Sequence, residues 1–316
     1  MKGLVWRGDQ DLSLEEVPDP APGEGEVVLD VELAGICGSD LHPYRGHPGP
    51  RVPPLILGHE VVGRVDGEQY TVYPLIGCGK CEWCAAGADN LCASWRLLGM
   101  HRAGAFAEQI VVPRHGLVPL PIGIDPRHAA LTEPLACCLA ALGPHDVGAN
   151  TRVLVLGCGP IGLLTVFAAA RSGAEVVAVD MVAERRRQAE QLGAVRAVAP
   201  SEDLAAGSVD IVIDAAGVQS TWRAGIDAVR NGGVVVVVGL GQAEGTFPMA
   251  LLVRGAIRLR GQFAYTRDEF VRALDVLASG DLDLSWVDEA SLGDGAGAFA
   301  NLVAQPEHYI KVLLRP

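Results

Sequence analysis

The chain has 316 residues, of which 49% are hydrophobic and 20% charged, and its formal net charge at pH 7 is -13. This length exceeds one typical core and fits two domains, each large enough to bury most of its apolar surface. The negative charge argues against a nucleic-acid partner, because affinity for DNA or RNA depends on a basic patch that neutralises phosphates.

Cysteine content and hydropathy indicate the compartment. The N-terminal stretch MKGLVWRGDQDLSLEEV lacks the apolar core and the small-residue cleavage site of a secretory signal peptide. The longest apolar run, VVVVVGL at 234–240, is far shorter than the roughly 20 residues needed to cross a bilayer. We therefore expect a soluble cytoplasmic protein without a membrane partner, whose eight cysteines stay reduced.

Short alternating strands dominate residues 1–125. Examples are EVVLDVELAG and FAEQIVVP, which Gly- and Pro-rich stretches such as PDPAPGEGE separate from their neighbours. This pattern predicts a compact β domain with loops.

Candidate metal ligands are scattered through this segment and just beyond it. Cys37 in GICGSDLH and His59 in LILGHE offer one soft and one borderline ligand, and Glu60 and Glu133 are candidate carboxylate ligands. Three protein ligands leave the fourth position of a tetrahedral zinc open for catalysis. Taken singly, His59 is also compatible with an ordinary core histidine and Cys37 with a small buried hydrophobe.

A second group of ligands lies in one loop, GCGKCEWCAAGADNLC. Its cysteines have C-x2-C-x2-C-x7-C spacing and are Cys78, Cys81, Cys84 and Cys92. Four thiolates suit a closed tetrahedral zinc that leaves no position for a substrate. The alternatives are two disulfides, which a reducing cytosol disfavours, and a nucleic-acid zinc finger, which the surrounding acidic residues disfavour. The loop is predicted to hold a structural zinc.

The pattern changes at about residue 126. DPRHAALTEPLACCLAAL is apolar at helical spacing, with Pro126 at the helix start, and apolar strands then alternate with helical stretches up to VVVVVGL. Such repetition predicts a parallel sheet covered on both faces. The tail is predicted to form two helices and a strand, YIKVLLRP, and to fold back on the first domain. We expect one domain from 1–125 and 262–316, and another from 126–261.

A dinucleotide motif opens the second domain. VLVLGCGPIGLL places Gly157, Gly159 and Gly162 as G-x-G-x-x-G after a strand, with Pro160 and Ile161 at the opening of a helix. The glycines permit a tight turn, approach of backbone to a pyrophosphate, and close packing of helix on strand. A glycine turn in an unrelated α/β fold is the alternative.

The residue that ends the next strand bears on the cofactor. Asp180 lies 18 positions beyond Gly162, close to the offset of a ribose-binding carboxylate. A carboxylate accepts hydrogen bonds from both ribose hydroxyls and repels a 2'-phosphate, which favours NAD. Arg185 and the two arginines after it could instead pair with such a phosphate, or form a solvated helix face, so NADP remains the alternative.

Taken together, the motifs closely resemble the zinc-containing medium-chain dehydrogenases, in particular the branch of polyol, sorbitol and threonine dehydrogenases. The resemblance covers nearly the whole chain and depends on GICGSDLH, LILGHE, the four-cysteine loop, LTEPLACCLAAL, GCGPIG and IKVLLRP. It implies an α/β protein in which a GroES-like β catalytic domain, built from both chain ends, surrounds a Rossmann domain with a doubly wound parallel sheet.

The resemblance also implies the ligands of a catalytic zinc. Cys37 and His59 would bind the metal, with Glu133 as the third ligand or its water-bridged substitute, while Glu60 sits beside the metal and can exchange onto it. Cys137 and Cys138 follow one turn after Glu133 and would either ligate instead or pack.

A proton relay is implied by the same resemblance. Ser39 would take the proton of a zinc-bound alcohol and pass it by the nicotinamide ribose toward His42, while Asp40 would orient the histidine ligand. Outside this context, Ser39 would be an ordinary turn hydroxyl and His42 a surface histidine.

Two stretches depart from the family. His59 and Cys78 are only 19 positions apart, so the hairpin usual between them is trimmed. His101 and Arg102 occupy a stretch that is commonly acidic or glycine-rich, and they face either the substrate or the surface.

The sequence therefore predicts an NAD-dependent dehydrogenase with one catalytic and one structural zinc per chain. We expect it to act on a secondary alcohol or its ketone, a polyol or related hydroxy compound, as a homo-oligomer, either a dimer or a tetramer. An NADP-dependent reductase of aldehydes or ketones and a catalytically silent cofactor-binding protein are the alternatives.

Overall fold

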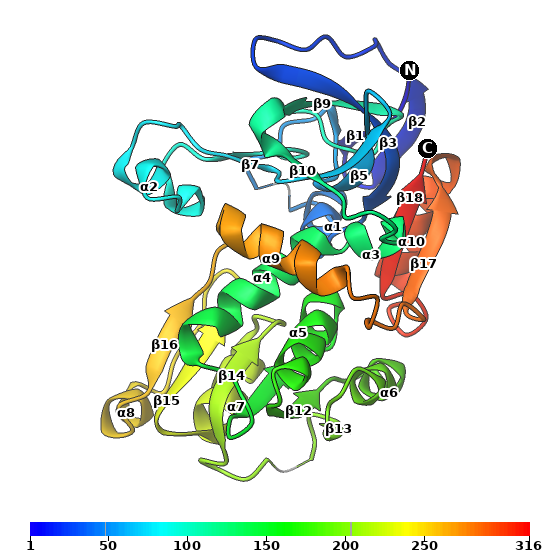
Figure 1. The fold of residues 1–316 in the computed structure, drawn as a ribbon. Helices are drawn as coiled ribbons and strands as arrows, with labels where there is room; N and C mark the ends of the chain where they lie inside the picture. The colour runs from blue at the N-terminus through cyan, green and yellow to red at the C-terminus, as the bar shows by residue number, and fades with distance from the viewer. Residues whose placement is uncertain (48, 203) are drawn as a thin grey trace. The chain divides into compact units, whose positions relative to one another are not determined.

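The computed structural model describes residues 1–47, 49–202 and 204–316, which form two compact units (Figure 1). Unit 1 consists of Met1–Glu133 and Thr266–Pro316, and unit 2 of Pro134–Tyr265. The first boundary falls inside helix α4 (Thr132–Leu142) and the second just before helix α9 (Arg267–Leu277). Within the described residues no helix is long and apolar enough to cross a bilayer.

The largest sheet of unit 1 has seven strands. Its order is β10-β6-β5-β3-β18-β17, with β9 also paired to β3. The bounds are β3 Glu26–Gly35, β5 Glu60–Val65, β6 Glu68–Val72, β9 Gln109–Pro113, β10 Leu117–Pro119, β17 Val287–Ser291 and β18 Lys311–Arg315. Strand β18 pairs antiparallel with β3 through Leu313 and Gly35, so a strand from the end of the chain lies beside the residues that lead to Cys37.

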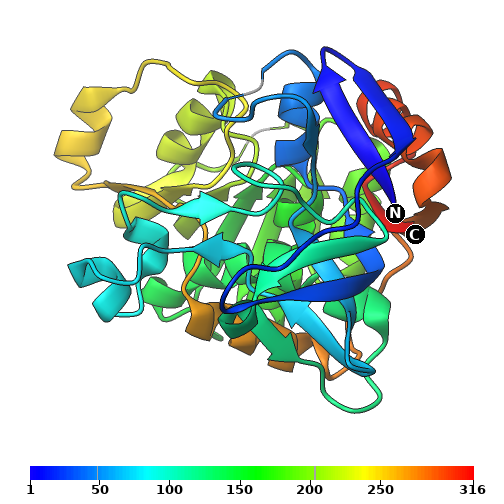
Figure 2. The same cartoon turned by 90° about the horizontal axis from the view of Figure 1, so that it is seen from above.

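Smaller elements complete unit 1. They are β1 Lys2–Gly8, β2 Asp11–Glu16 and β4 Leu55–Ile56 in a three-stranded sheet, the pair β7 Leu75–Ile76 and β8 Arg96–Leu97, and the helices α1 Gly38–Tyr44, α2 Glu82–Ala85, α3 Pro126–Ala129 and α10 Gly295–Ala304. The core includes Trp6, Phe106 and Phe299, and the last two rings meet edge to face with centroids 5.8 Å apart. The two chain ends lie near each other at one edge of unit 1 (Figure 2).

The trimmed hairpin that the sequence predicts is β5–β6. Val65 pairs with Glu68, so only Asp66 and Gly67 form the turn, and both have positive φ, 51° and 87°. An Asp-Gly pair is the preferred sequence for such a two-residue turn, because both positions require the left-handed region.

Unit 2 is the predicted doubly wound fold. Its six strands are all parallel in the order β13-β12-β11-β14-β15-β16, so the order reverses between β11 and β14. The strands are β11 Arg152–Leu156, β12 Glu175–Val179, β13 Arg196–Val198, β14 Val209–Asp214, β15 Val229–Val237 and β16 Arg258–Gly261; the helices are α5 Pro160–Arg171, α6 Ala183–Gln191, α7 Gln219–Ala228 and α8 Met249–Arg254. Ligands of such sheets bind at the carboxyl ends of the strands, where the order reverses.

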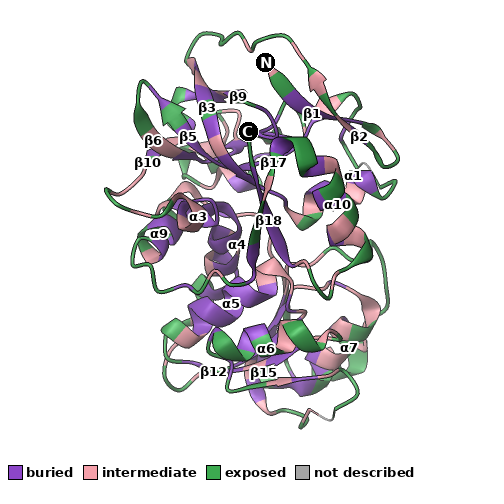
Figure 3. Ribbon diagram, turned by 90° about the vertical axis from the view of Figure 1, so that its right-hand side faces the viewer, coloured by how far each residue is buried: buried purple, intermediate pink, exposed green. Residues whose placement is uncertain are grey.

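Two details of unit 2 differ from the sequence pattern. Helix α7 ends at Ala228, and β15 begins at once, whereas the whole stretch TWRAGIDAVRNGG, residues 221–233, has the sequence pattern of a helix. The sequence also did not predict α8 and β16. Strand β16 is an edge strand whose Arg258 and Leu259 are both exposed, so it lacks the apolar run that marks the central strands. Helix α5, in contrast, is buried over most of its length (Figure 3).

Candidate metal centre and dinucleotide site

Three side chains from separate segments meet in unit 1. One ligand atom each of Cys37, His59 and Glu60 lies within 4.8 Å of the others. Cys37 directly precedes α1, Glu60 is the first residue of β5, and His59 lies directly before that strand. The turn before them needs glycine, because Gly58 has a φ of 97° and an added Cβ would lie 2.8 Å from the Phe106 ring. A thiolate, an imidazole and a carboxylate are zinc ligands.

Glu60 is fixed by a lysine from the far end of the chain. Lys311 Nζ donates to Glu60 Oε2 and, at 2.9 Å, to the carbonyl oxygen of Ile36. Both charged side chains are at most 1% exposed. An added Cβ on Gly35 would lie 2.0 Å from Glu60 Oε2, so glycine makes room for the pair.

The second oxygen of Glu60 is available to a cation. Oε1 is buried and has no hydrogen-bond partner among the described residues. Burying such an atom without a partner is costly, and native structures pair nearly all of them. The unsatisfied oxygen beside a cysteine and a histidine therefore fits a bound metal ion.

Asp40 lies behind the histidine. Its Oδ2 accepts from the Cys37 N–H at 3.1 Å, and its Oδ1 is 3.6 Å from His59 Nδ1 and 3.8 Å from Arg51 Nη2. Burial raises the pKa of Asp40, but His59, Arg51 and the Cys37 N–H together hold it below its ordinary value. Burial lowers the pKa of His59, yet Asp40 and Cys37 raise it well above the usual range. Because Nδ1 faces a carboxylate, the other ring nitrogen is left for a metal.

Ser39 and His42 share one face of α1, because they are three residues apart. Ser39 Oγ is buried and has no hydrogen-bond partner in the part of the chain that the structure describes. His42 is half-buried, and burial together with the nearby Arg45 and Arg51 lowers its pKa. The neutral form of this imidazole can therefore accept a proton near neutral pH.

Glu133 and the two cysteines after it occupy α4. Glu133 is 8% exposed in the first turn and is not a member of the close cluster formed by Cys37, His59 and Glu60. The Cys138 thiol lies 3.2 Å from the carbonyl oxygens of both Pro134 and Ile161, either of which can accept its single hydrogen. Cys138 is thus engaged in packing within unit 2.

The four cysteines of the loop converge. The sulfurs of Cys78, Cys81, Cys84 and Cys92 all lie within 4.8 Å of one another, and none of the chain's eight cysteines forms a disulfide. The Cys78 N–H points to Cys92 Sγ at 3.4 Å, and backbone N–H groups of Lys80 and Cys81 lower the pKa of Cys78 to about 6. Backbone donors that stabilise thiolates are what a four-sulfur zinc site requires.

This loop is tied to the rest of unit 1 through Tyr73. Its hydroxyl donates to Asp89 Oδ1 at 2.6 Å, and its ring packs edge to face on Phe270, with centroids 5.6 Å apart. The Arg267 guanidinium lies 6.0 Å from the same ring centroid. Burial and the bond to Asp89 raise the pKa of Tyr73, so the hydroxyl stays a donor.

The three glycines of the turn between β11 and α5 have different structural roles. Gly157, directly after β11, has a φ of 90°, and an added Cβ on Gly162 would lie 1.8 Å from the Gly157 carbonyl oxygen. Gly159, the residue before α5, has no protein atom within 4 Å of its Cβ position. Gly157 and Gly162 thus serve the turn itself, while Gly159 leaves open space at the helix N-terminus, where a phosphate binds favourably.

Asp180 follows β12 and stabilises the turn between β11 and α5 by hydrogen bonding. Its Oδ2 accepts from Cys158 N at 2.6 Å and its Oδ1 from Val182 N at 2.8 Å. Each carboxylate oxygen keeps a second lone pair for a ribose hydroxyl. Burial raises the pKa of the neighbouring Cys158 to about 12, so this thiol is inert at neutral pH.

The three arginines of α6 have separate environments. Arg186 donates to the carbonyl oxygens of Asp180 and Met181 at 2.8 and 3.0 Å, and Arg187 pairs with Glu184. Arg185 Nε is buried and lacks a hydrogen-bond partner among the described residues. Of the three, Arg186 is thus held next to Asp180 by its hydrogen bond to the Asp180 carbonyl oxygen.

His101 and Arg102 have local partners. Arg102 Nη1 lies 2.6 Å from Glu26 Oε1. The His101 ring packs edge to face on Trp95, with centroids 5.0 Å apart, and its Nδ1 accepts from Leu97 N at 3.2 Å. These contacts account for both side chains without a substrate.

Sequence reasoning missed Arg51 and Lys311. The signal for Lys311 was a charged residue inside the apolar strand YIKVLLRP, between Ile310 and Val312, which are buried. Arg51 had no such signal, because its surroundings are formed by residues distant in sequence.

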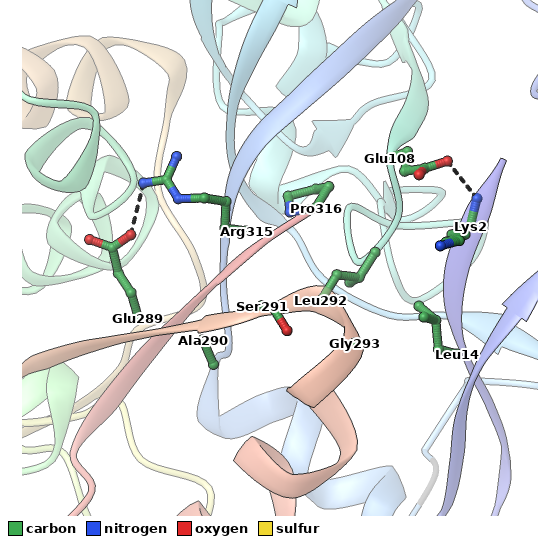
Figure 4. A pocket seen from close by; sticks show the side chains of 10 residues that line it. All are labelled: Lys2, Leu14, Glu108, Glu289, Ala290, Ser291, Leu292, Gly293, Arg315 and Pro316. Carbon is green, nitrogen blue, oxygen red and sulfur yellow. Dashed lines mark hydrogen bonds and ion pairs between the residues drawn. The ribbon is translucent and has the colours of Figure 1, made fainter.

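A cavity of about 500 Å³ lies elsewhere in unit 1, between β1, β17 and β18 (Figure 4). It is bordered by an ion pair between Arg315 and Glu289 at 2.8 Å and by Glu108, which accepts from Lys2 N at 2.7 Å. None of the candidate metal ligands lines it. The candidate metal centre is therefore not part of this cavity.

Comparison with known proteins agrees with both units. Residues 23–122 match the alcohol dehydrogenase GroES-like domain, and residues 160–279 match the zinc-binding dehydrogenase family. The sorbitol dehydrogenase of Halalkalibacterium halodurans is 33% identical over 88% of each chain.

Solved structures agree over the full length. A zinc-binding dehydrogenase from Sinorhizobium meliloti, bound to NADP, is 35% identical with a TM-score of 0.91, covering 100% of this chain and 99% of that one. A short chain alcohol dehydrogenase from Escherichia coli CFT073, complexed with NADH, is 27% identical with the same TM-score and coverage. The chain therefore belongs to the zinc-type medium-chain alcohol dehydrogenases, with a GroES-like domain and a zinc-binding dehydrogenase domain.

Proposed function

We propose that this enzyme transfers a hydride between a secondary alcohol and NAD, with the alcohol a polyol or a related hydroxy compound. The observation that carries the proposal is the close approach of Cys37, His59 and Glu60, with one carboxylate oxygen left unsatisfied. The sorbitol dehydrogenase relative supports the substrate class. We assign catalysis to the GroES-like domain, residues 1–125 and 262–316, and cofactor binding to residues 126–261.

The catalytic residues follow from this assignment. Cys37 and His59 would hold a catalytic zinc, with Glu133 as the third ligand or its water-bridged substitute, and Glu60 Oε1 would be able to exchange onto the metal. When bound, zinc would polarise the alcohol oxygen as a Lewis acid and the nicotinamide would accept the hydride. Asp40 fixes the orientation of His59 from behind.

We assign Ser39 and His42 to the transfer of the alcohol proton from the substrate to solvent. The buried Ser39 hydroxyl has no competing partner among the described residues, so it is free to accept the alcohol proton. His42, half-buried and with a lowered pKa, exchanges that proton with solvent. Because Ser39 would pass its own proton on toward His42 as it accepts one, no net charge would accumulate on the serine.

We assign a second, structural zinc to Cys78, Cys81, Cys84 and Cys92. Four convergent sulfurs leave no open position, so this ion would stabilise the loop and take no part in turnover. We also propose a cytoplasmic location, because cysteine ligands of zinc stay reduced there.

We assign NAD as the cofactor, held by Gly157, Gly159, Gly162 and the Asp180 carboxylate. The negative charge of Asp180 would repel a 2'-phosphate. One observation favours NADP instead: the S. meliloti structure contains it, and Arg186 donates to the carbonyl oxygen of Asp180 in this chain. An NADP-dependent aldehyde or ketone reductase is thus the second candidate.

We also propose that the enzyme is a homo-oligomer. Strand β16 is an edge of the six-stranded sheet, and the chain from the end of β15 to just beyond β16 carries several exposed apolar side chains, namely Leu240, Met249, Leu251, Val253, Leu259 and Phe263. Exposed apolar groups next to an open sheet edge are typical of a surface that another chain covers. Sedimentation of the purified protein tests this assignment.

Metal analysis and a substrate panel test the function. Two zinc ions per chain, and NADH formation with polyols or hydroxy acids, would support the proposal. One zinc per chain, lost when Cys81 is replaced, would show that only the loop binds metal and would favour a silent cofactor-binding protein. Higher kcat/KM with NADPH and ketones would favour the second candidate.

A further inference from the structure

A buried arginine lies behind the candidate metal centre. Arg51 is 6% exposed, and its Nε donates to the Gly99 carbonyl oxygen at 3.2 Å. Arginine is almost never fully buried unless an anion or several acceptors compensate its charge. Its ion-pair partner is Asp40, whose side chain is fully buried.

Three unsatisfied polar atoms meet at this point. His59 Nδ1, Asp40 Oδ1 and Arg51 Nη2 are all buried without a hydrogen-bond partner among the described residues. Asp40 Oδ1 lies between the two nitrogens, at 3.6 and 3.8 Å. These distances are too long for hydrogen bonds, but they are short for unscreened charges in a buried site.

The other oxygen of Asp40 is already committed. Oδ2 accepts from the Cys37 N–H at 3.1 Å, so Asp40 joins the backbone of one candidate ligand to the ring of another. The position of Oδ1 then depends on the two nitrogens that face it. A small movement toward His59 would form the hydrogen bond that orients a ligating imidazole.

We propose that Arg51 is a positioning residue of the metal centre, the fixed cation that holds the Asp40 carboxylate in place behind His59. Arginine suits the role because its charge does not depend on pH and its planar group reaches Gly99 and Asp40 at once. The inference rests on the proposed function, since the metal it serves is the catalytic zinc.

A purely structural role is the competing explanation. In that case the arginine would only tether its loop to Gly99, and its loss would lower stability without changing metal affinity. The variant Arg51→Gln separates the two roles, because glutamine can still donate a hydrogen bond to a carbonyl but carries no charge. Arg51→Lys restores the charge, and Arg51→Met is a second uncharged variant in case glutamine does not fold.

The experiment measures zinc affinity by competition with a chromogenic chelator, alongside melting temperature. The four-cysteine loop serves as an internal reference in the same chain, and Arg64→Met, which removes an exposed arginine paired with Glu32, is the control. We expect Arg51→Gln to lower the zinc affinity of the catalytic site by about 10-fold or more, which is the usual effect of losing a residue that orients a metal ligand. The zinc affinity of the four-cysteine loop should not change. Arg51→Lys should recover most of the loss, and Arg64→Met should bind zinc as the wild type does.

Two further results decide the mechanism. If Arg51 acts through Asp40, the Arg51→Gln effect should largely vanish in an Asp40→Asn background. The absorption spectrum of the cobalt-substituted protein should change in Arg51→Gln, because the ligand geometry changes. Unchanged catalytic-site affinity in Arg51→Gln, or an equal effect in both backgrounds, would overturn the inference. A wild type that binds only loop zinc would instead overturn the proposed function.

Discussion

Lys311 and Glu60 form an ion pair across 251 positions of sequence, with both side chains at most 1% exposed. The same ammonium donates to the carbonyl oxygen of Ile36, the residue before Cys37. One lysine thus fixes the backbone beside one candidate ligand and the carboxylate of another. Removing one partner of a buried pair leaves the other charge uncompensated, which typically costs about 3–5 kcal/mol.

Lys311→Met is therefore expected to lower the free energy of unfolding by about 3–5 kcal/mol. Chemical denaturation monitored by fluorescence measures this. Lys2→Met, at an exposed lysine, is the control and should change stability little. Adding Glu60→Gln to Lys311→Met should recover part of the loss, because it removes the buried charge. A single variant as stable as the control would contradict this account.

Gly159→Ala and Gly162→Ala should have opposite phenotypes. An added Cβ at residue 159 meets no protein atom within 4 Å, so this variant should keep its melting temperature but bind NADH more weakly, since the methyl group enters the space left for the pyrophosphate. At residue 162 the Cβ would lie 1.8 Å from the Gly157 carbonyl oxygen, so stability should fall. Calorimetry and NADH fluorescence titration test the pair. Normal NADH affinity in Gly159→Ala would show that the cofactor lies elsewhere.

Cys81→Ser and Cys37→Ser should separate stability from turnover. Loss of a loop ligand should lower zinc content and melting temperature while turnover per folded molecule largely survives, because structural zinc contributes folding free energy directly. Loss of Cys37 should abolish turnover with a smaller effect on melting. A stable Cys81→Ser protein that has lost all activity, with the other zinc still bound, would place the chemistry in the loop.

Asp180→Ala should relax the preference for NAD over NADP, because it removes both the ribose hydrogen bonds and the repulsion of a 2'-phosphate. The alanine also deprives Cys158 N and Val182 N of their acceptor, so stability should fall as well. Asp180→Asn keeps one acceptor oxygen and separates the two effects. The ratio of kcat/KM for the two cofactors is the measurement. Equal kinetics with both in the wild type would contradict the assigned role.

Ser39→Ala should lower kcat by about 10²-fold or more, the usual scale for a lost acid-base partner. The affinity for NAD and the zinc content should stay near wild-type values, because this hydroxyl has no hydrogen-bond partner among the described residues. Ser13→Ala, at a serine in β2, is the control. A variant with near wild-type kcat would remove Ser39 from the mechanism.

The sequence was sufficient for the family and the fold class, because each depends on local patterns. The glycines of the turn, the alternation of strands and helices, and the cysteine spacing are all readable within short windows, and the doubly wound sheet and the family are confirmed. The roles of the individual site residues stay predictions. Lys311 and Arg51 were missed because their partners, Glu60, Gly99 and Asp40, are brought to them only by folding.

Strand β16, at the edge of the Rossmann sheet, also could not be predicted from the sequence. Among the described residues, strand β16 pairs with β15 on one side only. Its Arg258 and Leu259 side chains are exposed, so its sequence lacks the apolar run of a buried strand. Its position is set by pairing with a neighbour rather than by its own composition. Edge strands of this kind are therefore harder to find from sequence than the central strands.

Unit 1 is built from two separate stretches of the chain, and the second of them is synthesised only after all of unit 2. A nascent chain that has emerged through Tyr265 already carries every candidate metal ligand and the whole of unit 2, but not strand β18 or Lys311. Until that strand adds to β3, Glu60 has no ammonium partner and the sheet beside Cys37 is incomplete. Unit 2 can therefore fold during translation, whereas the cluster of candidate metal ligands gains its lysine partner only once strand β18 has been synthesised.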